Sequence, residues 1–178
     1  MSKALKNTLD LFNLTRIDRD LYSWTGQSVG FQRIFGGQIM AQCLIAGYQT
    51  VDKGRMVHSF HSYFLRPGDF KQNIIFEVDR IRDGKSFTTR RVVAIQNGRQ
   101  IFNMAASFQI EEPSWSHQHK MKDVKGPDGV LNRNEQRKLI VEKIPEKRRA
   151  NFLNPKPIEI RDVDPPALFE PKPAPDKN

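Results

Sequence analysis

The segment FGGQIMAQCLIAGYQT, residues 35–50, is the main determinant of the predicted fold. Its apolar residues point in nearly every direction around a helix, and they are Ile39, Met40, Ala41, Cys43, Leu44, Ile45 and Ala46. A helix that is apolar all round is expected to be buried all round. Gly36-Gly37 permits the backbone to turn sharply into the helix and to approach a neighbour or ligand closely. The segment therefore predicts a central helix inside the core.

From residue 57 to residue 110 the apolar pattern changes to a period of two, which is typical of strands. Asp83-Gly84 and Asn97-Gly98 separate three strand-like stretches, and both dipeptides favour tight hairpin turns with positive backbone angles. One face of the last stretch is apolar: Phe102, Met104, Ala106, Phe108 and Ile110. In the stretch before it, the apolar residues Phe87, Val93 and Ile95 share one parity and so are expected on the same face of the strand. The pattern predicts an α+β domain in which an antiparallel sheet curls around the buried helix.

After Glu112 the sequence becomes polar and charged, and one short amphipathic helix is expected near residues 132–143. Frequent prolines from residue 154 onward disfavour any packed element there. We therefore predict a folded domain over residues 1–112. A charged linker with a short helix is predicted over residues 113–161, and a Pro-rich tail over residues 162–178.

The net charge of +9 raises the question of a nucleic-acid partner. The basic excess is densest in residues 117–161, where no aromatic-interleaved basic strand or recognition helix accompanies it, so nucleic-acid binding is not predicted. Such charge can equally steer an acidic small molecule such as a nucleotide-bearing substrate. No apolar run is long enough for a membrane span. The single cysteine, Cys43, excludes a disulfide within the chain and favours a reducing, cytoplasmic setting.

Five spaced motifs carry a resemblance to a known family. They are FGGQ (residues 35–38), HSFHSYFLRPGD (58–69), RDGKSF (82–87), RRVVAIQNG (90–98) and ASFQ (106–109). In this order they resemble the N-terminal half of the acyl-CoA thioesterase II family, over residues 14–112. The resemblance implies the hotdog fold, an antiparallel sheet wrapped around a long buried helix.

The resemblance also implies an activity: hydrolysis of fatty acyl-CoA to a free fatty acid and CoA, with no cofactor. Family members are double hotdogs, and an Asp, a Ser or Thr and a Gln of the second repeat orient the attacking water. No position of this chain matches those three residues. We therefore expect an N-terminal half that self-associates or pairs with a second hotdog repeat. The alternative is a non-catalytic hotdog module that binds acyl-CoA or a partner subunit.

His58 and His61 stand out in the strand-like run VHSFHSYFLRPGD, residues 57–69. Three residues apart on a strand, they point to opposite faces unless a bulge intervenes, and no neighbouring Cys, His or Asp cluster supplies further ligands, so no metal site is predicted. His58 shares its parity with Phe60, Ser62 and Phe64. Two interpretations stay open for His58: a partner on the catalytic face of the complete enzyme, or a hydrogen-bonded structural histidine near the repeat interface.

Gly36, Gly37 and Gln38 open the central helix, where free N–H groups can bind a carbonyl oxygen or a phosphate. They are the candidate substrate-binding residues. The alternative is that the two glycines only permit tight packing of the helix on the sheet.

Three other positions invite a functional interpretation. Cys43 is expected to be a small buried core residue and not a nucleophile, because nothing near it in sequence would lower its pKa. Arg66 is expected to hold a turn through a contact with Asp69, with a role at a CoA phosphate as the alternative. Arg90 and Arg91 point to opposite faces of one strand, so one is expected in solvent and the other against a partner repeat or CoA.

Overall fold

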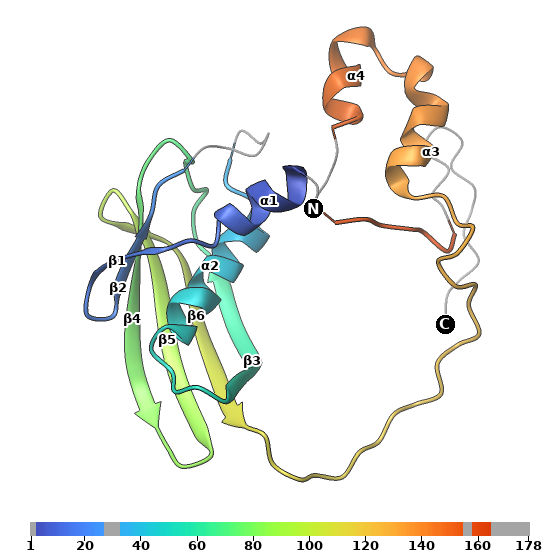
Figure 1. The fold of residues 1–178 in the computed structure, drawn as a ribbon. Coiled ribbons are helices and arrows are strands. Elements are labelled where there is room, and N and C mark those ends of the chain that lie inside the picture. Colours follow the sequence, from blue (N-terminus) through green and yellow to red (C-terminus); the bar gives the residue numbers. More distant parts are fainter. Residues whose placement is uncertain (1–2, 27–32, 155–157, 165–178) are drawn as a thin grey trace. The chain divides into compact units, whose positions relative to one another are not determined.

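The computed structural model describes residues 3–26, 33–154 and 158–164 (Figure 1). Lys6–Trp115 form one compact unit, and the described residues from Ser116 onward belong with residues 3–5 to another. The division falls close to the boundary predicted at residue 112, while the linker and tail assigned to residues 113–178 stay predictions. Within the described ranges, every helix is too short or too polar to cross a membrane.

The first unit is built on one antiparallel sheet. Helix α1 (Lys3–Asp10) precedes the hairpin of β1 (Thr15–Asp18) and β2 (Leu21–Trp24), and α2 (Gly36–Tyr48) follows. The remaining strands are β3 (Arg55–Phe64), β4 (Ile74–Asp83), β5 (Phe87–Gln96) and β6 (Arg99–Ile110). The strand order is β1-β2-β4-β5-β6-β3, so β1 and β3 form the two edges.

Helix α2 lies across β4, β5 and β6, as Figure 1 shows. The core between helix and sheet contains Tyr22, Trp24, Ile39, Cys43, Ala46, Ile74, Phe76, Val78, Val92, Ala94, Phe102, Met104, Ala106 and Phe108. The sheet side chains in this core recur every second residue, as expected for one inward-facing side of a pleated sheet. The predicted arrangement, an antiparallel sheet around a central helix, is confirmed.

The burial of α2 differs from the prediction, because only one side of the helix is fully buried. That side carries Gln38, Ile39, Gln42, Cys43, Ala46 and Gly47. Met40, Ala41, Leu44 and Ile45 on the remaining circumference are only partly buried. A single sheet covers one side of a helix, so this apolar remainder is available for a further packing partner.

The face of β5 that meets α2 is also not the predicted one. Val92 pairs with Met104 and Ala94 with Phe102, which turns the even-numbered residues of β5 toward the helix. Phe87, from the predicted face, is 45% exposed on the outer side. The inward positions include the polar residues Thr88, Arg90 and Gln96. Because these residues are polar, the period-two pattern assigned the wrong face of β5 to the core.

The two predicted hairpins are both present, with different turns. Asn97 (φ 51°) and Gly98 (φ 69°) have the positive angles of the predicted tight turn. In the other hairpin β4 continues through Asp83, and residues 84–86 connect it to β5. Gly84 does not have a positive φ. A Cβ there would lie 2.9 Å from the carbonyl oxygen of Phe87, so this position needs glycine because of a close backbone approach.

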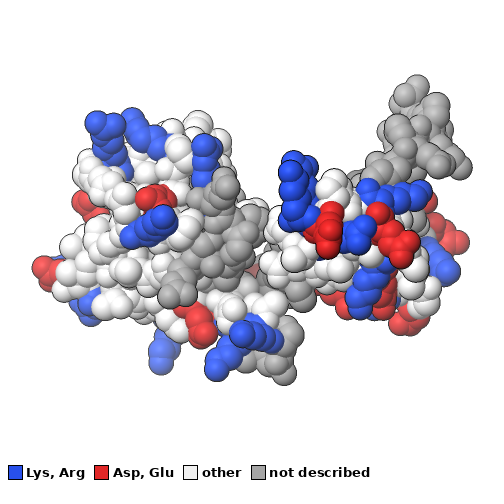
Figure 2. All heavy atoms as spheres, turned by 90° about the horizontal axis from the view of Figure 1, so that it is seen from above, with Lys and Arg blue, Asp and Glu red and all other residues white. Residues whose placement is uncertain are grey.

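The second unit contains α3 (Arg133–Ile140), the 3-10 turn η1 (Val141–Lys143) and α4 (Glu146–Phe152). The helix expected near residues 132–143 corresponds to α3 and η1, whereas α4 was not predicted. Asn132 and Glu135 cap α3 reciprocally. Arg133 forms an ion pair with Asp162 at 2.7 Å, so the first residue of the predicted Pro-rich tail pairs with α3. On the face seen in Figure 2, Lys and Arg of this unit alternate with Asp and Glu.

Candidate functional site

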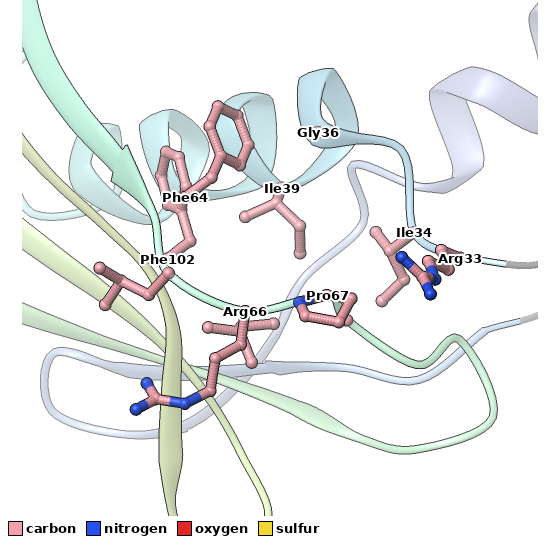
Figure 3. Close-up of a pocket in the computed structure, with 11 residues that line it drawn as sticks. Arg33, Ile34, Gly36, Ile39, Phe64, Arg66, Pro67 and Phe102 are labelled. Atoms are coloured by element: carbon pink, nitrogen blue, oxygen red, sulfur yellow. The ribbon is translucent and has the colours of Figure 1, made fainter.

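A cavity of about 370 Å³ lies where α2 begins (Figure 3). Its walls come from the loop before α2, the first turns of α2, the end of β3 with the following loop, and the start of β6. Most of the lining is apolar: Ile34, Ile39, Phe64, Leu65, Pro67, Ile101 and Phe102. Gly36 and Gly68 complete the wall, and Arg33 and Arg66 add two cationic side chains. An apolar cavity with a few polar groups is the usual form of a small-molecule site.

The walls of this cavity differ in how firmly they are held. Ile39, Ile101 and Phe102 belong to the buried core, with exposures of 4%, 5% and 1%. Phe64 is 58% exposed, and its ring lies 4.9 Å from that of Phe102 in a tilted arrangement. The backbone N–H of Ile34 donates to the carbonyl oxygen of Gly68 at 3.2 Å, which joins the loop before α2 to the loop after β3.

Gln96 holds the loop after β3 in place. Its side-chain oxygen accepts from the N–H of Asp69 at 2.8 Å, and its side-chain nitrogen donates to the carbonyl oxygens of Asp69 and Gln72 at 2.7 and 3.1 Å. The predicted contact between Arg66 and Asp69 is wrong, because Arg66 donates to the carbonyl oxygen of Gln100 at 2.7 Å. A glutamine at the end of a strand gives no signal in the sequence for such a role.

The N-terminus of α2 presents unpaired N–H groups. Phe35 precedes the helix without a side-chain cap, and its carbonyl oxygen accepts from the N–H of Gln38 at 2.9 Å. Among the described residues, the N–H groups of Gly36 and Gly37 have no acceptor. The side-chain nitrogen of Gln38 is also buried without a partner in that part of the chain. Of the three predicted substrate-binding residues, Gly36 lines the cavity, while Gly37 and Gln38 do not.

A bulge in β3 changes the direction of His58. Val57 pairs with Phe108 and Ser59 pairs with Ser107, so His58 is an extra residue between two consecutive pairs. The Nε2 atom of His58 lies 2.8 Å from the hydroxyl oxygen of Ser107, an outward-facing residue of β6. The predicted parity, with His58 on the side of Phe60, Ser62 and Phe64, is therefore wrong.

The outer face of the sheet thus carries both histidines of β3. The His58 ring packs edge-on against Phe87 at 5.7 Å, and His61 pairs with Ala105 on the same face. Because α2 lies on the opposite face, the structure does not bring His58 together with Gly36 and the cavity. Among the described residues, no group of three or more His, Cys, Asp or Glu side chains is placed to hold a metal ion.

Arg90 is 1% exposed and uses all five of its N–H groups. It donates to the hydroxyl and carbonyl oxygens of Thr50, to the carbonyl oxygens of Arg82 and Thr89, and to the carboxylate of Asp83. The Arg90 guanidinium lowers the pKa of the Asp83 carboxyl. The hypothesis that this arginine contacts a partner or CoA is therefore wrong.

Arg91 and Cys43 follow their predictions. The Arg91 side chain is exposed on the outer face. Cys43 is a fully buried core residue, and burial raises the pKa of its thiol. A thiol in that state is a poor nucleophile, which leaves Cys43 a packing role.

The comparisons with known proteins agree with this architecture. Residues 24–109 match the acyl-CoA thioesterase N-terminal domain. The chain is 36% identical to acyl-CoA thioesterase 2 of Haemophilus influenzae over 161 residues, which cover 90% of this chain and 56% of that protein. It is 39% identical to acyl-coenzyme A thioesterase 8 of Mus musculus over 183 residues, covering 96% of this chain and 56% of the relative. The chain thus spans little more than half the length of these relatives.

Solved structures also match most of this chain and about half of their own length. An acyl-CoA thioesterase II from Mycobacterium marinum is 38% identical with a TM-score of 0.62, over 70% of this chain and 46% of that one. A hot dog fold protein from Alicyclobacillus acidocaldarius, 22% identical with a TM-score of 0.64 over 71% of this chain and 48% of that one, supports the fold alone. The motifs, the helix-wrapping sheet and these relatives agree, and the chain belongs to the acyl-CoA thioesterase II family with a hotdog fold.

Proposed function

We propose that the chain contributes to hydrolysis of fatty acyl-CoA thioesters and so acts in fatty acid metabolism. One observation carries the proposal: Gly36, whose N–H has no acceptor among the described residues, lines a cavity of about 370 Å³ with mostly apolar lining residues. In the reaction, the oxygen of a water molecule adds to the thioester carbonyl carbon. The C–S bond then breaks, and the proton from water passes to the departing CoA thiolate. Helix N–H groups stabilise the negative charge that develops on the carbonyl oxygen.

The charges around the cavity suit a CoA ester. Arg33 and Arg66 line the cavity, and neither forms an ion pair within the described residues. Unpaired guanidinium groups attract phosphate groups such as those of CoA. The apolar walls then receive the acyl chain, while the anionic part of the substrate stays near the arginines.

We further propose that a second hotdog repeat packs along β3, either in a second copy of the chain or in a longer protein. Among the described residues β3 is an edge of the sheet, so one side of this strand has no neighbouring strand. Its side chains include exposed apolar residues: Met56, Phe60, Tyr63 and Phe64. The partly buried side of α2 adds apolar surface. A monomer by light scattering after gel filtration, at all concentrations tested, would contradict self-association.

The alternative function is a non-catalytic module that binds acyl-CoA. It is favoured by the position of His58, the catalytic candidate predicted from the sequence, which does not line the cavity. His58 lies on the outer face of the sheet and is hydrogen-bonded to Ser107. This arrangement favours the structural interpretation of the histidine. A cytoplasmic location stays a prediction from the single buried cysteine, Cys43.

Two measurements on the purified chain separate these functions. Release of CoA from dodecanoyl-CoA is followed with a thiol reagent, and the buried Cys43 gives little background. Binding is followed with a CoA thioether, in which a CH₂ group replaces the carbonyl so that hydrolysis cannot occur. CoA release supports the enzyme, and binding without release supports the module. A chain that neither releases CoA nor binds the thioether contradicts both functions.

A further inference from the structure

The cavity at the start of α2 has three fixed walls and one that is able to move. Ile39, Ile101 and Phe102 are buried core residues and cannot shift without disturbing the packing of the sheet. The ring of Phe64 is 58% exposed, so it has room to rotate. A change at Phe64 therefore alters the space in the cavity with little effect on the core.

Phe64 also spans the part of the cavity next to the helix. Its ring lies against Gly36, where a Cβ atom would be 2.8 Å from the Cε1 atom of Phe64. On its other side the ring contacts Phe102 of β6, with 4.9 Å between the centroids. Figure 3 shows the Phe64 side chain between the start of α2 and the strand that carries Phe102. The ring of Phe64 thus occupies the part of the cavity between Gly36 and Phe102.

We propose that Phe64 determines the length of the acyl chain that the cavity accepts. This inference rests on the proposed function, because it takes the ligand to be an acyl chain attached to CoA. The ring limits the apolar space beyond the thioester, so methylenes beyond that limit remain in water. Each methylene that enters the cavity strengthens binding, by about fourfold for complete burial. Affinity therefore rises with chain length and levels off at the length that the ring permits.

The test uses CoA thioethers with alkyl chains from butyl to hexadecyl, titrated calorimetrically into the full chain. In the wild type, affinity is expected to rise with chain length and then to level off. Phe64→Ala enlarges the cavity, so affinity should keep rising over longer chains. Phe64→Trp fills more of it, so affinity should level off at shorter chains. Phe64→Leu keeps an apolar side chain and should lie between Ala and the wild type, and its melting curve reports on folding.

Phe87 provides the matched control. It is an aromatic residue of similar exposure, 45%, on the outer face of the sheet, and it does not line the cavity. Phe87→Ala should leave the levelling-off length unchanged, and the same shift in both variants would contradict a specific role for Phe64. An equal loss of affinity for all chain lengths in folded Phe64 variants would also overturn the inference. If the wild type binds no thioether, the proposed function itself fails.

Discussion

The guanidinium of Arg90 donates to both the hydroxyl and the carbonyl oxygen of Thr50, at 2.8 and 2.9 Å. Thr50 lies just after the C-terminal end of α2, and Arg90 lies on β5. These two bonds, with a third to the carboxylate of Asp83 at 2.6 Å, join the end of the helix to the β4–β5 hairpin. Arg90 thus fixes the end of α2 that lies opposite the cavity.

Replacing Arg90 should destabilise the fold strongly. Arg90→Met removes the donors but keeps an unbranched apolar chain. The carbonyl oxygen of Thr50 then loses its donor, while the Thr50 hydroxyl keeps only its bond to the carbonyl oxygen of Gly47. We expect the free energy of unfolding to fall by about 3 kcal/mol, because several hydrogen bonds are lost together and a buried carbonyl oxygen is left without a donor. Urea denaturation measures the change.

Arg91→Met is the matched control, because Arg91 is the next residue on β5 and is exposed. Its effect should stay within about 0.5 kcal/mol, as is usual at surface positions. Equal losses in the two variants would contradict the structural role given to Arg90.

The ion pair between Arg90 and Asp83 should make stability depend on pH in acid. The pKa of Asp83 is lower in the folded chain than in the unfolded one, so the pair stabilises the fold above the ordinary aspartate pKa of about 3.9. That contribution is lost as the pH falls through the lowered pKa. Because the Asp83 side chain is 57% exposed, we expect it to amount to about 1 kcal/mol or less.

The measurement compares wild type and Asp83→Asn by urea denaturation from neutral pH down to about pH 2. The wild type should be the more stable at neutral pH, and the difference should vanish at the acid end. Asp52→Asn, which alters an exposed aspartate outside the ion pairs of the described residues, is the control. A difference that stays constant over the whole range would contradict the ion-pair explanation.

Much of the fold could be predicted because the apolar residues of α2 and β6 follow simple patterns. The apolar run of α2 and the parity of Phe102 to Phe108 specify a helix on a sheet, and Asn97-Gly98 specifies one turn. The inward face of β5 could not be predicted, because Arg90 is polar and only its five hydrogen bonds make burial favourable. Two of those bonds go to Thr50, forty residues away in the sequence, so they depend on the packing of α2 on the sheet.

The candidate site was less predictable than the fold. Gly36 could be proposed from sequence because free N–H groups at a helix start are a general property. The orientation of His58 depends on one bulge, which moves a side chain to the other face of a strand without any sequence signal. Phe64 and Arg33 meet at the cavity only through the packing of α2 on the end of β3.

The two arginines of the cavity should bind the anionic part of the ligand. Arg33→Gln combined with Arg66→Gln should weaken binding of a dodecyl-CoA thioether by about tenfold at low salt, since each exposed charge pair contributes up to about 1 kcal/mol. The difference from wild type should shrink near 1 M salt, where the screening length is about 3 Å. Arg91→Gln on the outer face is the control and should have little effect. A loss of affinity that does not respond to salt would contradict an electrostatic role.

The position of His58 predicts a small effect on function and a local effect on stability. His58→Leu removes the bond to the Ser107 hydroxyl, so the free energy of unfolding should fall by about 1 kcal/mol, the usual value of one hydrogen bond. Ser107→Ala should have a similar effect, and the double variant should be less destabilised than the sum of the two, because they share one bond. Thioether binding and any CoA release should stay within about threefold of wild type, far from the roughly hundredfold loss expected for a general acid or base. A hundredfold loss of CoA release in a folded His58→Leu variant would restore the catalytic interpretation.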